Sequence, residues 1–311
     1  YSVYRSPTFN IGLGYRVLET DPDKADTLMK AVKVYPFSRR ANSLQNKFLT
    51  PGDKAWSQTP PSGMAYWERL AELLNQESVA ERDQFFMAML KPLGMEKGKP
   101  FQPDARQKKI LTDAAFVGEQ MAKANSFDKR FPGSAYRKDA RWEIVFAPGF
   151  SPDQKADGYG QLDERAAYTW EAVWTTAGMV TKTPGVGQAY LGAHRDKNGD
   201  ALDGAKSYRL HVPPNPPAGQ FWSVTIYDLE TRRPVENAQG LVDRSSRQAD
   251  ILKNADGSVD LYFGPQVLKG HESNSLTTVP GRAWFALFRL YGPLQPYFDR
   301  SWRLPDIEKV K

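Results

Sequence analysis

Short apolar runs alternate with turn signals throughout the last third of the chain. Several runs place apolar and polar residues in turn, the period-two pattern of strands that bury one face. The runs are Gln188–His194, Tyr208–Val212, Phe221–Tyr227, Ser258–Phe263 and Trp284–Tyr291. Regularly spaced short strands of this kind are typical of an antiparallel sandwich or jelly roll. We therefore expect one such domain here.

The turn after the first of these runs carries a hairpin signal. Asn198 and Gly199 both tolerate the positive φ that a two-residue hairpin turn requires. A hairpin centred on this pair joins Gln188–His194 to Tyr208–Val212 and places His194 opposite Asp203. The core of the domain is expected to come largely from five aromatic residues: Phe221, Trp222, Trp284, Phe285 and Phe288.

The middle of the chain changes to a helical period, with apolar residues three and four positions apart. Proline, serine and a capping-box pattern at Ser78–Glu81 mark helix starts. The apolar stripes are Trp67, Leu70 and Leu74; Phe85, Phe86, Met89 and Leu90; Ile110, Ala114, Val117 and Met121; and Ala167, Trp170 and Trp174. We interpret all four stripes as core-facing surfaces, with aromatic ligand shelves as the alternative.

The first part of the chain is predicted to be β-like. Thr8–Val17 and Val32–Pro36 are expected strands, and Asp21–Lys30 a short helix. The fold class is therefore α+β: a jelly-roll-like C-terminal sandwich, a helical middle segment and a partial N-terminal β unit. The expected domains are residues 1–58, a remnant of a β unit, residues 59–180, which are helical, and residues 181–311, which form the sandwich.

The amino-acid composition argues against several classes of function. The chain has 311 residues, with 42 basic and 36 acidic side chains, but its basic residues are scattered and accompany no nucleic-acid-binding motif. We expect no nucleic-acid partner. The absence of cysteine excludes thiolate catalysis, cysteine-ligated zinc and disulfides. No run approaches the roughly 18 apolar residues of a membrane helix, so no membrane span is expected.

Most catalytic and metal motifs are missing from the sequence. It has three histidines and no His-Glu-x-x-His motif, nucleophile elbow, P-loop or dinucleotide fingerprint. One metal-like pattern remains: Asp196, Asn198, Asp200 and Asp203 offer the alternating oxygen ligands that calcium prefers. The alternative is a hairpin tip whose acidic residues solvate the turn. We otherwise expect no cofactor.

A carboxylate beside large aromatic residues gives the best candidate for acid–base chemistry. Glu171 follows Trp170, and partial desolvation would raise the pKa of a carboxyl group there. The alternative is an exposed glutamate on the helix face near the N-terminus, where the helix dipole favours a negative charge. Arg289 ends a strongly apolar strand, so its side chain needs an edge, a carboxylate or a ligand. We expect any pocket where the helix meets the C-terminal sheet, lined by Trp170, Glu171, Arg289 and Tyr291. The alternative is a plain ion pair between Arg289 and Glu171.

Motifs along nearly the whole chain resemble the paired bacterial DUF1254/DUF1214 proteins. The helical matches lie at residues 66–70, 82–86, 92–94 and 162–165, and the denser C-terminal matches at 190–192, 202–204, 208–210, 221–228, 256–262, 289–293 and 302–305. The Phe-Trp-Ser-Val-Thr segment at 221–225 and Arg-Leu-Tyr-Gly-Pro at 289–293 are the most specific. The resemblance implies two jelly-roll-like units joined by helices, and a periplasmic or secreted location. It implies no reaction.

The resemblance also implies a longer N-terminal β domain, with an Asn-Pro-Asp-Thr-Leu-Tyr segment, than this sequence contains. We expect residues 8–17 to pair with a second copy, with the C-terminal domain or with a separate N-terminal piece, because an unpaired sheet edge is a liability. Three functions stay open: binding of a small organic or sugar-like ligand, a carboxylate-dependent hydrolase or lyase, and a structural or assembly role.

Overall fold

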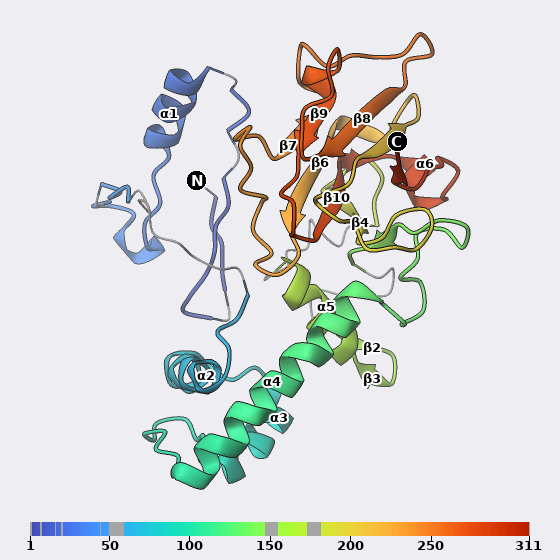
Figure 1. Cartoon of the computed structure of the whole chain (residues 1–311). Coiled ribbons are helices and arrows are strands. Elements are labelled where there is room, and N and C mark those ends of the chain that lie inside the picture. Colours follow the sequence, from blue (N-terminus) through green and yellow to red (C-terminus); the bar gives the residue numbers. More distant parts are fainter. Residues whose placement is uncertain are drawn as a thin grey trace. The chain divides into compact units, whose positions relative to one another are not determined.

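The structure is a computed structural model that describes residues 2–6, 8–15, 17–19, 21–43, 45–49, 59–146, 155–172 and 182–310. The chain divides into two compact units (Figure 1). The first comprises Tyr1–Trp56 and Pro61–Phe116, and the second comprises Ser57–Pro60 and Val117–Lys311.

The first unit is helical. Its elements are α1 (Pro22–Ala31), α2 (Met64–Gln76), α3 (Gln84–Leu90), the first half of α4 (Ala105–Phe127), and short 3₁₀ turns at Phe37–Arg39, Glu81–Asp83 and Lys91–Leu93. Asp21 starts α1 because its carboxylate accepts the backbone N–H groups of Asp23 and Lys24. The indole N–H of Trp67 on α2 donates to the carbonyl of Leu111 on α4 at 2.6 Å. Leu111 is buried, so this bond joins the two helices at their contact.

Neither expected N-terminal strand forms among the described residues, where Thr8–Val17 and Val32–Pro36 contain no strand. Side chains take up part of their backbone hydrogen bonding instead. The carboxylate of Glu77 accepts the N–H groups of Phe9 and Asn10 at 2.6 and 2.8 Å. The amide of Asn46 similarly bonds the backbone of Val32 and Val34. In these segments, side chains of Glu77 and Asn46 therefore bond the backbone groups that a neighbouring strand would otherwise bond.

The core-facing interpretation of the helical stripes is wrong for two helices. On α4, Ile110, Val117 and Met121 are exposed by 46, 55 and 64%. On α3, Phe85 and Met89 are exposed as well. The stripe of α5 (Leu162–Ala172) is buried as predicted at Ala167 and Trp170, while Trp174 lies outside the described residues. Periodicity identified an apolar face in each case, but it does not say what covers that face.

The second unit contains the predicted β-sandwich, built from two sheets. The five-stranded sheet has the order β1 (Glu143–Ile144), β4 (Gln188–Ala193), β10 (Trp284–Pro293), β6 (Ala218–Asp228) and β7 (Asp243–Ser245). The four-stranded sheet has the order β11 (Glu308–Lys309), β5 (Tyr208–Val212), β8 (Val259–Gly264) and β9 (Ser275–Thr277). Pairing is antiparallel except between β8 and β9. The remaining elements are a small hairpin of β2 (Lys155–Ala156) and β3 (Tyr159–Gly160), a 3₁₀ turn at Glu272–Asn274, and α6 (Gln295–Phe298).

Strand β10 is buried on both faces, so its residues divide between two cores. Trp284 and Phe288 belong to the main core, which also takes residues from the four-stranded sheet. Phe285 and Leu287 point the other way and pack in a second core with Tyr168 of α5 and the segment ending at Phe146. All five aromatic residues predicted for the core are buried. The second core shows that α5 covers the outer face of the five-stranded sheet.

The predicted hairpin turn forms, but its flanking strands belong to different sheets. Strand β4 pairs with β1 and β10, whereas β5 pairs with β8 and β11. Gly199 has a φ of 89° while Asn198 keeps a negative φ. The carboxylate of Asp196 accepts the N–H groups of Asn198 and Asp200 and thereby folds the turn. As a result, Arg195 pairs with Ala201, and His194 lies opposite Leu202 rather than Asp203.

Candidate functional site

A group of buried ionisable side chains lies where α5 covers the five-stranded sheet. We call it the Lys129 cluster, and it consists of Lys129, Glu143, Glu171, His194 and Arg232. The Nζ atom of Lys129 is 2.8 Å from Oε2 of Glu171 and 3.0 Å from Oε2 of Glu143. The side chains of Lys129 and Glu171 are fully buried, and that of Glu143 is 20% exposed. Ionised groups that lie so deep require close partners, and here they have them.

Five separate parts of the chain supply the cluster, the fifth being the loop after β6 that carries Arg232. Lys129 follows α4, Glu143 lies on β1, Glu171 on α5, and His194 directly after β4. The position opposite Glu171 on β4 is Gly192, where an added Cβ would stand 2.9 Å from Oε1 of Glu171. A side chain at that position would displace the carboxylate. A larger residue at position 192 would therefore have to shift the end of the Glu171 side chain, whereas the backbone conformation itself does not call for glycine.

The two partners of Lys129 explain its charge state. Burial by itself would lower the pKa of Lys129, but the neighbouring charges of Glu171 and Glu143 outweigh that effect and raise it. Burial raises the pKa of Glu143, and Lys129 only partly opposes that shift. The lysine therefore stays cationic at neutral pH.

His194 has no hydrogen-bond partner among the described residues, although it is buried. Its ring stacks on Phe285 at 5.1 Å between centroids and lies 5.3 Å from Phe127. Neither Nδ1 nor Nε2 is exposed or bonded to any described group. Burial, reinforced by the positive charges of Lys129, Arg232 and Arg195, holds the pKa of His194 well below its usual value. The imidazole is therefore neutral at pH 7, with one donor and one acceptor left unused.

Arg232 closes the cluster from the loop after β6. Its Nε donates to the carbonyl of Trp170 at 3.2 Å and its Nη2 to the hydroxyl of Ser126 at 3.3 Å. The guanidinium lies 4.2 Å from the ring centre of Phe285. Burial lowers the pKa of Arg232 to about 10, which leaves it cationic. Its φ of 60° is unusual for a residue other than glycine, and such strain is concentrated at functional positions.

The cluster is balanced in charge but incomplete in hydrogen bonding. Two cations, Lys129 and Arg232, face two carboxylates, and His194 is neutral. Buried atoms without a hydrogen-bond partner in the described part of the chain are Oε1 of Glu171, Nη1 of Arg232 and both ring nitrogens of His194. Such orphaned buried groups are rare in folded proteins and require an explanation, such as water or a ligand. This site therefore has unused donors and acceptors but no excess charge.

The four predicted site residues do not converge on a single contact. Glu171 pairs with Lys129, and the alternative considered above, an ion pair between Arg289 and Glu171, is not found among the described residues. The ring of Trp170 lies under Lys123, whose Nζ is 5.5 Å from the ring centre.

Arg289 and Tyr291 lie instead in a group of aromatic side chains on the same sheet. Arg289 donates to the hydroxyl of Tyr227, and its guanidinium lies 5.6 Å from the ring centres of both Tyr190 and Tyr227. Tyr291 stacks on Phe221 at 3.9 Å between centroids. Burial by itself would lower the pKa of Arg289, but the surrounding tyrosine hydroxyls outweigh it and raise the pKa. A cation thus needs no carboxylate in this position.

The acidic hairpin tip binds a lysine of its own chain. Lys309 on β11 lies 3.2 Å from Oδ2 of Asp196 and also pairs with Asp200. The other oxygen of Asp196 accepts the two N–H groups of the turn, and Asp203 accepts the N–H of Ala205. Asp200 and Asp196 together raise the pKa of Lys309 to about 12. Within the described ranges, no group of three or more His, Cys, Asp or Glu side chains is arranged to hold a metal ion.

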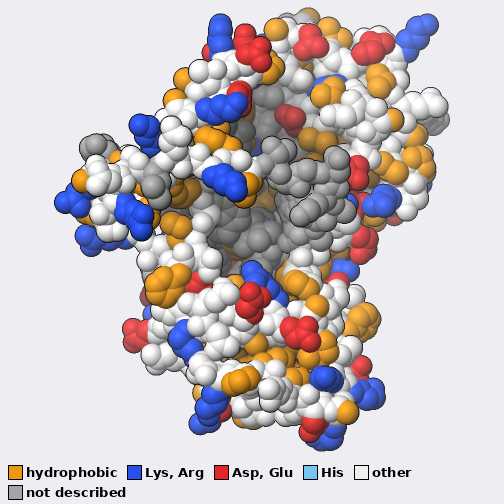
Figure 2. Space-filling model, turned by 90° about the vertical axis from the view of Figure 1, so that its left-hand side faces the viewer, with side chains coloured by type: hydrophobic (Ala, Val, Ile, Leu, Met, Phe, Trp, Pro, Cys, Tyr) orange, Lys and Arg blue, Asp and Glu red, His pale blue; other side chains and the backbone are white. Residues whose placement is uncertain are grey.

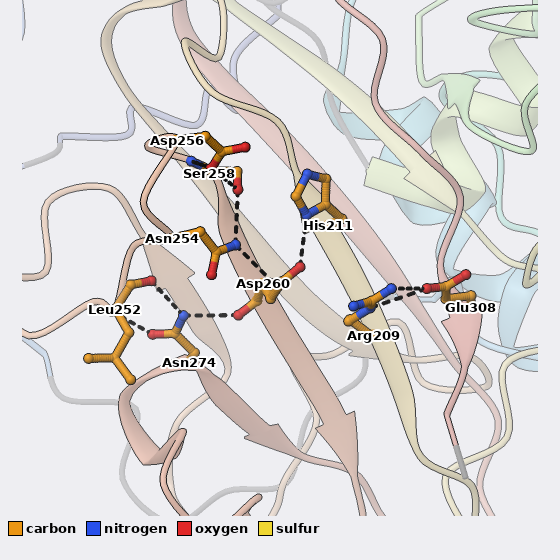
Figure 3. A network of polar contacts seen from close by, with 9 residues as sticks. All are labelled: Arg209, His211, Leu252, Asn254, Asp256, Ser258, Asp260, Asn274 and Glu308. Carbon is orange, nitrogen blue, oxygen red and sulfur yellow. Dashed lines mark hydrogen bonds and ion pairs between the residues drawn. The ribbon is translucent and has the colours of Figure 1, made fainter.

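His211 belongs to a different polar network, on the outer face of the four-stranded sheet (Figure 3). Its Nδ1 lies 2.8 Å from Oδ1 of Asp260 on the neighbouring strand. Asn254 donates to the second oxygen of Asp260 and to Ser258, and Asn274 donates to the Asp260 carbonyl. The polar groups of this network bond to one another, in contrast to those around His194. We interpret it as a structural network that orders β5, β8 and the Asp256–Ser258 turn.

Charges of both signs are interspersed on the molecular face in Figure 2, without a continuous basic surface.

No helix within the described residues carries an apolar stretch long enough to cross a lipid bilayer.

Comparison with known proteins identifies one domain family. Residues 187–295, which include most of the sandwich strands, match DUF1214, a family described as proteins of unknown function. The comparison with curated proteins gave no match.

Two solved bacterial structures are similar to the chain. The VPA0106 protein from Vibrio parahaemolyticus is 20% identical, with a TM-score of 0.48 over 94% of this chain and 67% of that one. A putative uncharacterized protein from Burkholderia cenocepacia is 14% identical, with a TM-score of 0.27 over 73% of this chain. The match covers 49% of the Burkholderia chain, so the present chain accounts for about half of that protein's length.

Apart from Glu171, the residues of the Lys129 cluster carry little signal in the sequence. Lys129 and Arg232 each belong to a basic pair, Lys129-Arg130 and Arg232-Arg233, in which one side chain is buried and the other is not. No motif in the sequence marks His194 as a buried residue. The one usable signal was its position at the end of an apolar strand, Ala189–Ala193, where a histidine is easily drawn into the core.

Proposed function

We propose that the chain binds a small, neutral, hydroxyl-bearing organic molecule at the Lys129 cluster. The observation that supports this proposal is His194, a buried neutral imidazole with no hydrogen-bond partner among the described residues. Leaving a buried polar group unbonded costs about 1–3 kcal/mol, and the cluster contains several such groups. A molecule that satisfies them would recover much of this free energy on binding.

The chemistry of the unused groups favours a neutral ligand. A neutral imidazole presents one acceptor and one N–H donor, and a hydroxyl group can satisfy either. Nη1 of Arg232 needs an acceptor, and Oε1 of Glu171 needs a donor. Because the cationic and anionic groups already balance, a charged ligand would leave an uncompensated charge in a buried site. Phe127 and Phe285 supply apolar walls, so a sugar-like or other polyhydroxyl compound fits best.

Native mass spectrometry of the purified protein tests the proposal. We expect a bound neutral molecule on the wild type that is absent from His194→Phe, in which a phenyl ring keeps the stacking but removes both nitrogens. The matched control is His211→Phe, which changes a histidine of the outer network and should keep the adduct. Calorimetric titration with glucose and glycerol then measures affinity for defined probes. An adduct that survives His194→Phe, or a cluster satisfied by ordered water alone, would contradict the proposal.

The enzyme alternative uses the same site. Oε1 of Glu171 is buried and unbonded, as a general base or acid would be before substrate arrives. Turnover of the bound compound that is lost in Glu171→Gln, with binding retained, would assign a carboxylate-dependent hydrolase or lyase. Binding without turnover in both proteins would leave the binding function.

The exposed apolar stripe on α4 favours assembly as a second candidate function. Ile110, Val117 and Met121 share one face of a 23-residue helix, and Phe116 beside them is 63% exposed. We expect light scattering to give a mass above the 35.0 kDa of one chain, and Val117→Glu with Met121→Glu to return it to one chain. Lys109→Glu changes a charge on the same helix and should have no such effect. A wild-type chain that is monomeric at high concentration would contradict assembly.

The family relationship of the N-terminal residues and the cellular location of the protein can also be proposed. We propose that the residues before the DUF1214 match derive from a DUF1254-like region, and that the protein acts in the bacterial cell envelope. Fractionation of cells that express the protein would test the location.

A further inference from the structure

We infer a second binding site, for a small organic carboxylate with an apolar body, in a pocket at one end of the β-sandwich. The pocket has a volume of about 210 Å³. For scale, an engineered cavity of about 150 Å³ holds benzene. Its floor includes Val235, Val279 and Trp284, and its rim carries Arg233 and Arg282. The site is separate from the proposed function, since none of these residues belongs to the Lys129 cluster.

The loop after β6 forms one wall of the pocket. The N–H of Asp228 donates to the carbonyl of Arg233, and the N–H of Arg232 donates to the carbonyl of Asp228, which closes a tight hairpin. Inside the loop, Oδ1 of Asp228 accepts both the N–H and the hydroxyl of Thr231 at 2.8 Å. Arg232 turns toward α5 while Arg233 lines the pocket. The consecutive arginines thus serve two different sites.

The segment from Val279 to Trp284 forms the opposite wall. The N–H of Arg282 donates to the carbonyl of Val279, and Gly281 adopts a φ of 80° within this turn. The guanidinium of Arg282 then reaches across, and its Nη1 lies 3.0 Å from Oδ2 of Asp228. The two walls are therefore joined by this charged hydrogen bond, in addition to the backbone bond from the N–H of Leu229 to the carbonyl of Ala283, and the charged bond uses one of the N–H groups of Arg282.

The carboxylates of the pocket differ in how firmly they are held. All the bonds described for Asp228 come from its own loop and from Arg282, and its side chain is 9% exposed. Burial would raise the pKa of Asp228, but the hydrogen bonds from Thr231 and Arg282 outweigh that effect and lower it. Glu236, by contrast, is 76% exposed and touches Arg233 only through an ion pair of 2.9 Å. An exposed ion pair of this kind contributes little free energy, so a ligand can readily displace Glu236 from Arg233.

The unused groups of the pocket are donors. The Nε atom of Arg233 is buried without a partner among the described residues, and so is the indole N–H of Trp284. Arg282 adds further N–H groups at the rim, where its side chain is 60% exposed. A carboxylate accepts such donors in pairs and replaces Glu236 at Arg233, while an apolar body covers Val235 and Val279. This combination of donors above an apolar floor selects an organic carboxylate over inorganic anions.

Calorimetric titration with benzoate tests the inference, and benzyl alcohol serves as the uncharged comparison. We expect benzoate to bind at least tenfold more tightly than benzyl alcohol, because only the carboxylate satisfies the arginines. Arg233→Gln should weaken benzoate binding by about tenfold or more. Glu236→Gln should tighten it by about threefold, since it removes the competing carboxylate.

Two controls separate this site from other effects. Arg209→Gln removes an arginine that pairs with Glu308 on the four-stranded sheet, outside the pocket, and should leave benzoate binding unchanged. His194→Phe should also leave benzoate binding unchanged. A negative result for ligand binding at the Lys129 cluster therefore does not decide whether this pocket binds a carboxylate. If Arg233→Gln fails to fold, Glu236→Gln decides the question. Equal binding of benzoate and benzyl alcohol, or unchanged or weaker benzoate binding to Glu236→Gln, would overturn the inference.

Discussion

Lys129→Met is expected to destabilise the second unit by about 3–5 kcal/mol, the usual cost of removing one partner from a buried ion pair. The substitution leaves Glu171 fully buried without its cation, and Glu143 only 20% exposed. Methionine matches the lysine side chain closely in length, so lost packing contributes little. The midpoint of urea unfolding, followed by tryptophan fluorescence, measures the change, because Trp142, Trp222, Trp284 and Trp302 all lie in the main core.

Two further variants identify the cause. Lys129→Met combined with Glu171→Gln should recover much of the loss, since position 171 then no longer carries a fully buried negative charge without its cation. Lys123→Met removes a lysine whose partners Glu119 and Glu230 are 23% and 73% exposed, and should cost less than about 1 kcal/mol. An equal loss in the single and double variants would show that the lysine acts through packing and not through its charge.

Strand positions in the last third of the chain were predictable from the sequence, but strand partners were not. The alternation in Tyr208–Val212 and the apolar run in Trp284–Tyr291 each identified a real strand, since a pleated strand displays burial directly along the sequence. Strands β4 and β5, joined by a turn, were expected to pair and instead belong to opposite sheets. Strand pairing depends on which distant strand lies alongside in the folded chain, and for β4 that strand is β10.

Helical periodicity was informative in the same limited way. It located the apolar faces of α4 and α5 correctly, yet the α5 face is buried and the α4 face is exposed. An apolar stripe records that a face avoids water, and it does not record whether the covering surface comes from the same chain. The exposed α4 stripe is therefore the physical basis for proposing assembly.

The candidate site was predictable only at Glu171, one of its two acidic residues. Glu171 stood out because it follows a tryptophan on an apolar helix face, and it is fully buried. Its partner Lys129 is 42 positions away in the sequence, and no local pattern connects a lysine after one helix with a glutamate on another. Sheet register brings Glu143 and His194 to the same place, because β1 and β4 pair beside each other. Buried charge networks of this kind are tertiary features.

His194 makes stability fall as the pH drops below about 6.5. In the unfolded chain this histidine has an ordinary pKa of about 6.5, while burial and the charges of Lys129, Arg232 and Arg195 hold its pKa in the folded protein well below that value. Below pH 6.5 the unfolded state therefore binds one more proton than the folded state. Linkage then lowers the folding equilibrium constant by up to about tenfold per pH unit until the folded pKa is reached.

Urea unfolding of wild type and His194→Phe between pH 5 and pH 7.5 isolates this contribution. The phenyl ring can stack on Phe285 and Phe127 as the imidazole does, but it takes up no proton. All other groups titrate in both proteins, so the difference between the two stability curves reports position 194 alone. We expect the curves to run parallel above pH 7 and to diverge below 6.5, with the wild type losing stability faster. Curves that stay parallel down to pH 5 would mean that the folded protein can protonate His194, and that the ring nitrogens reach a partner or water.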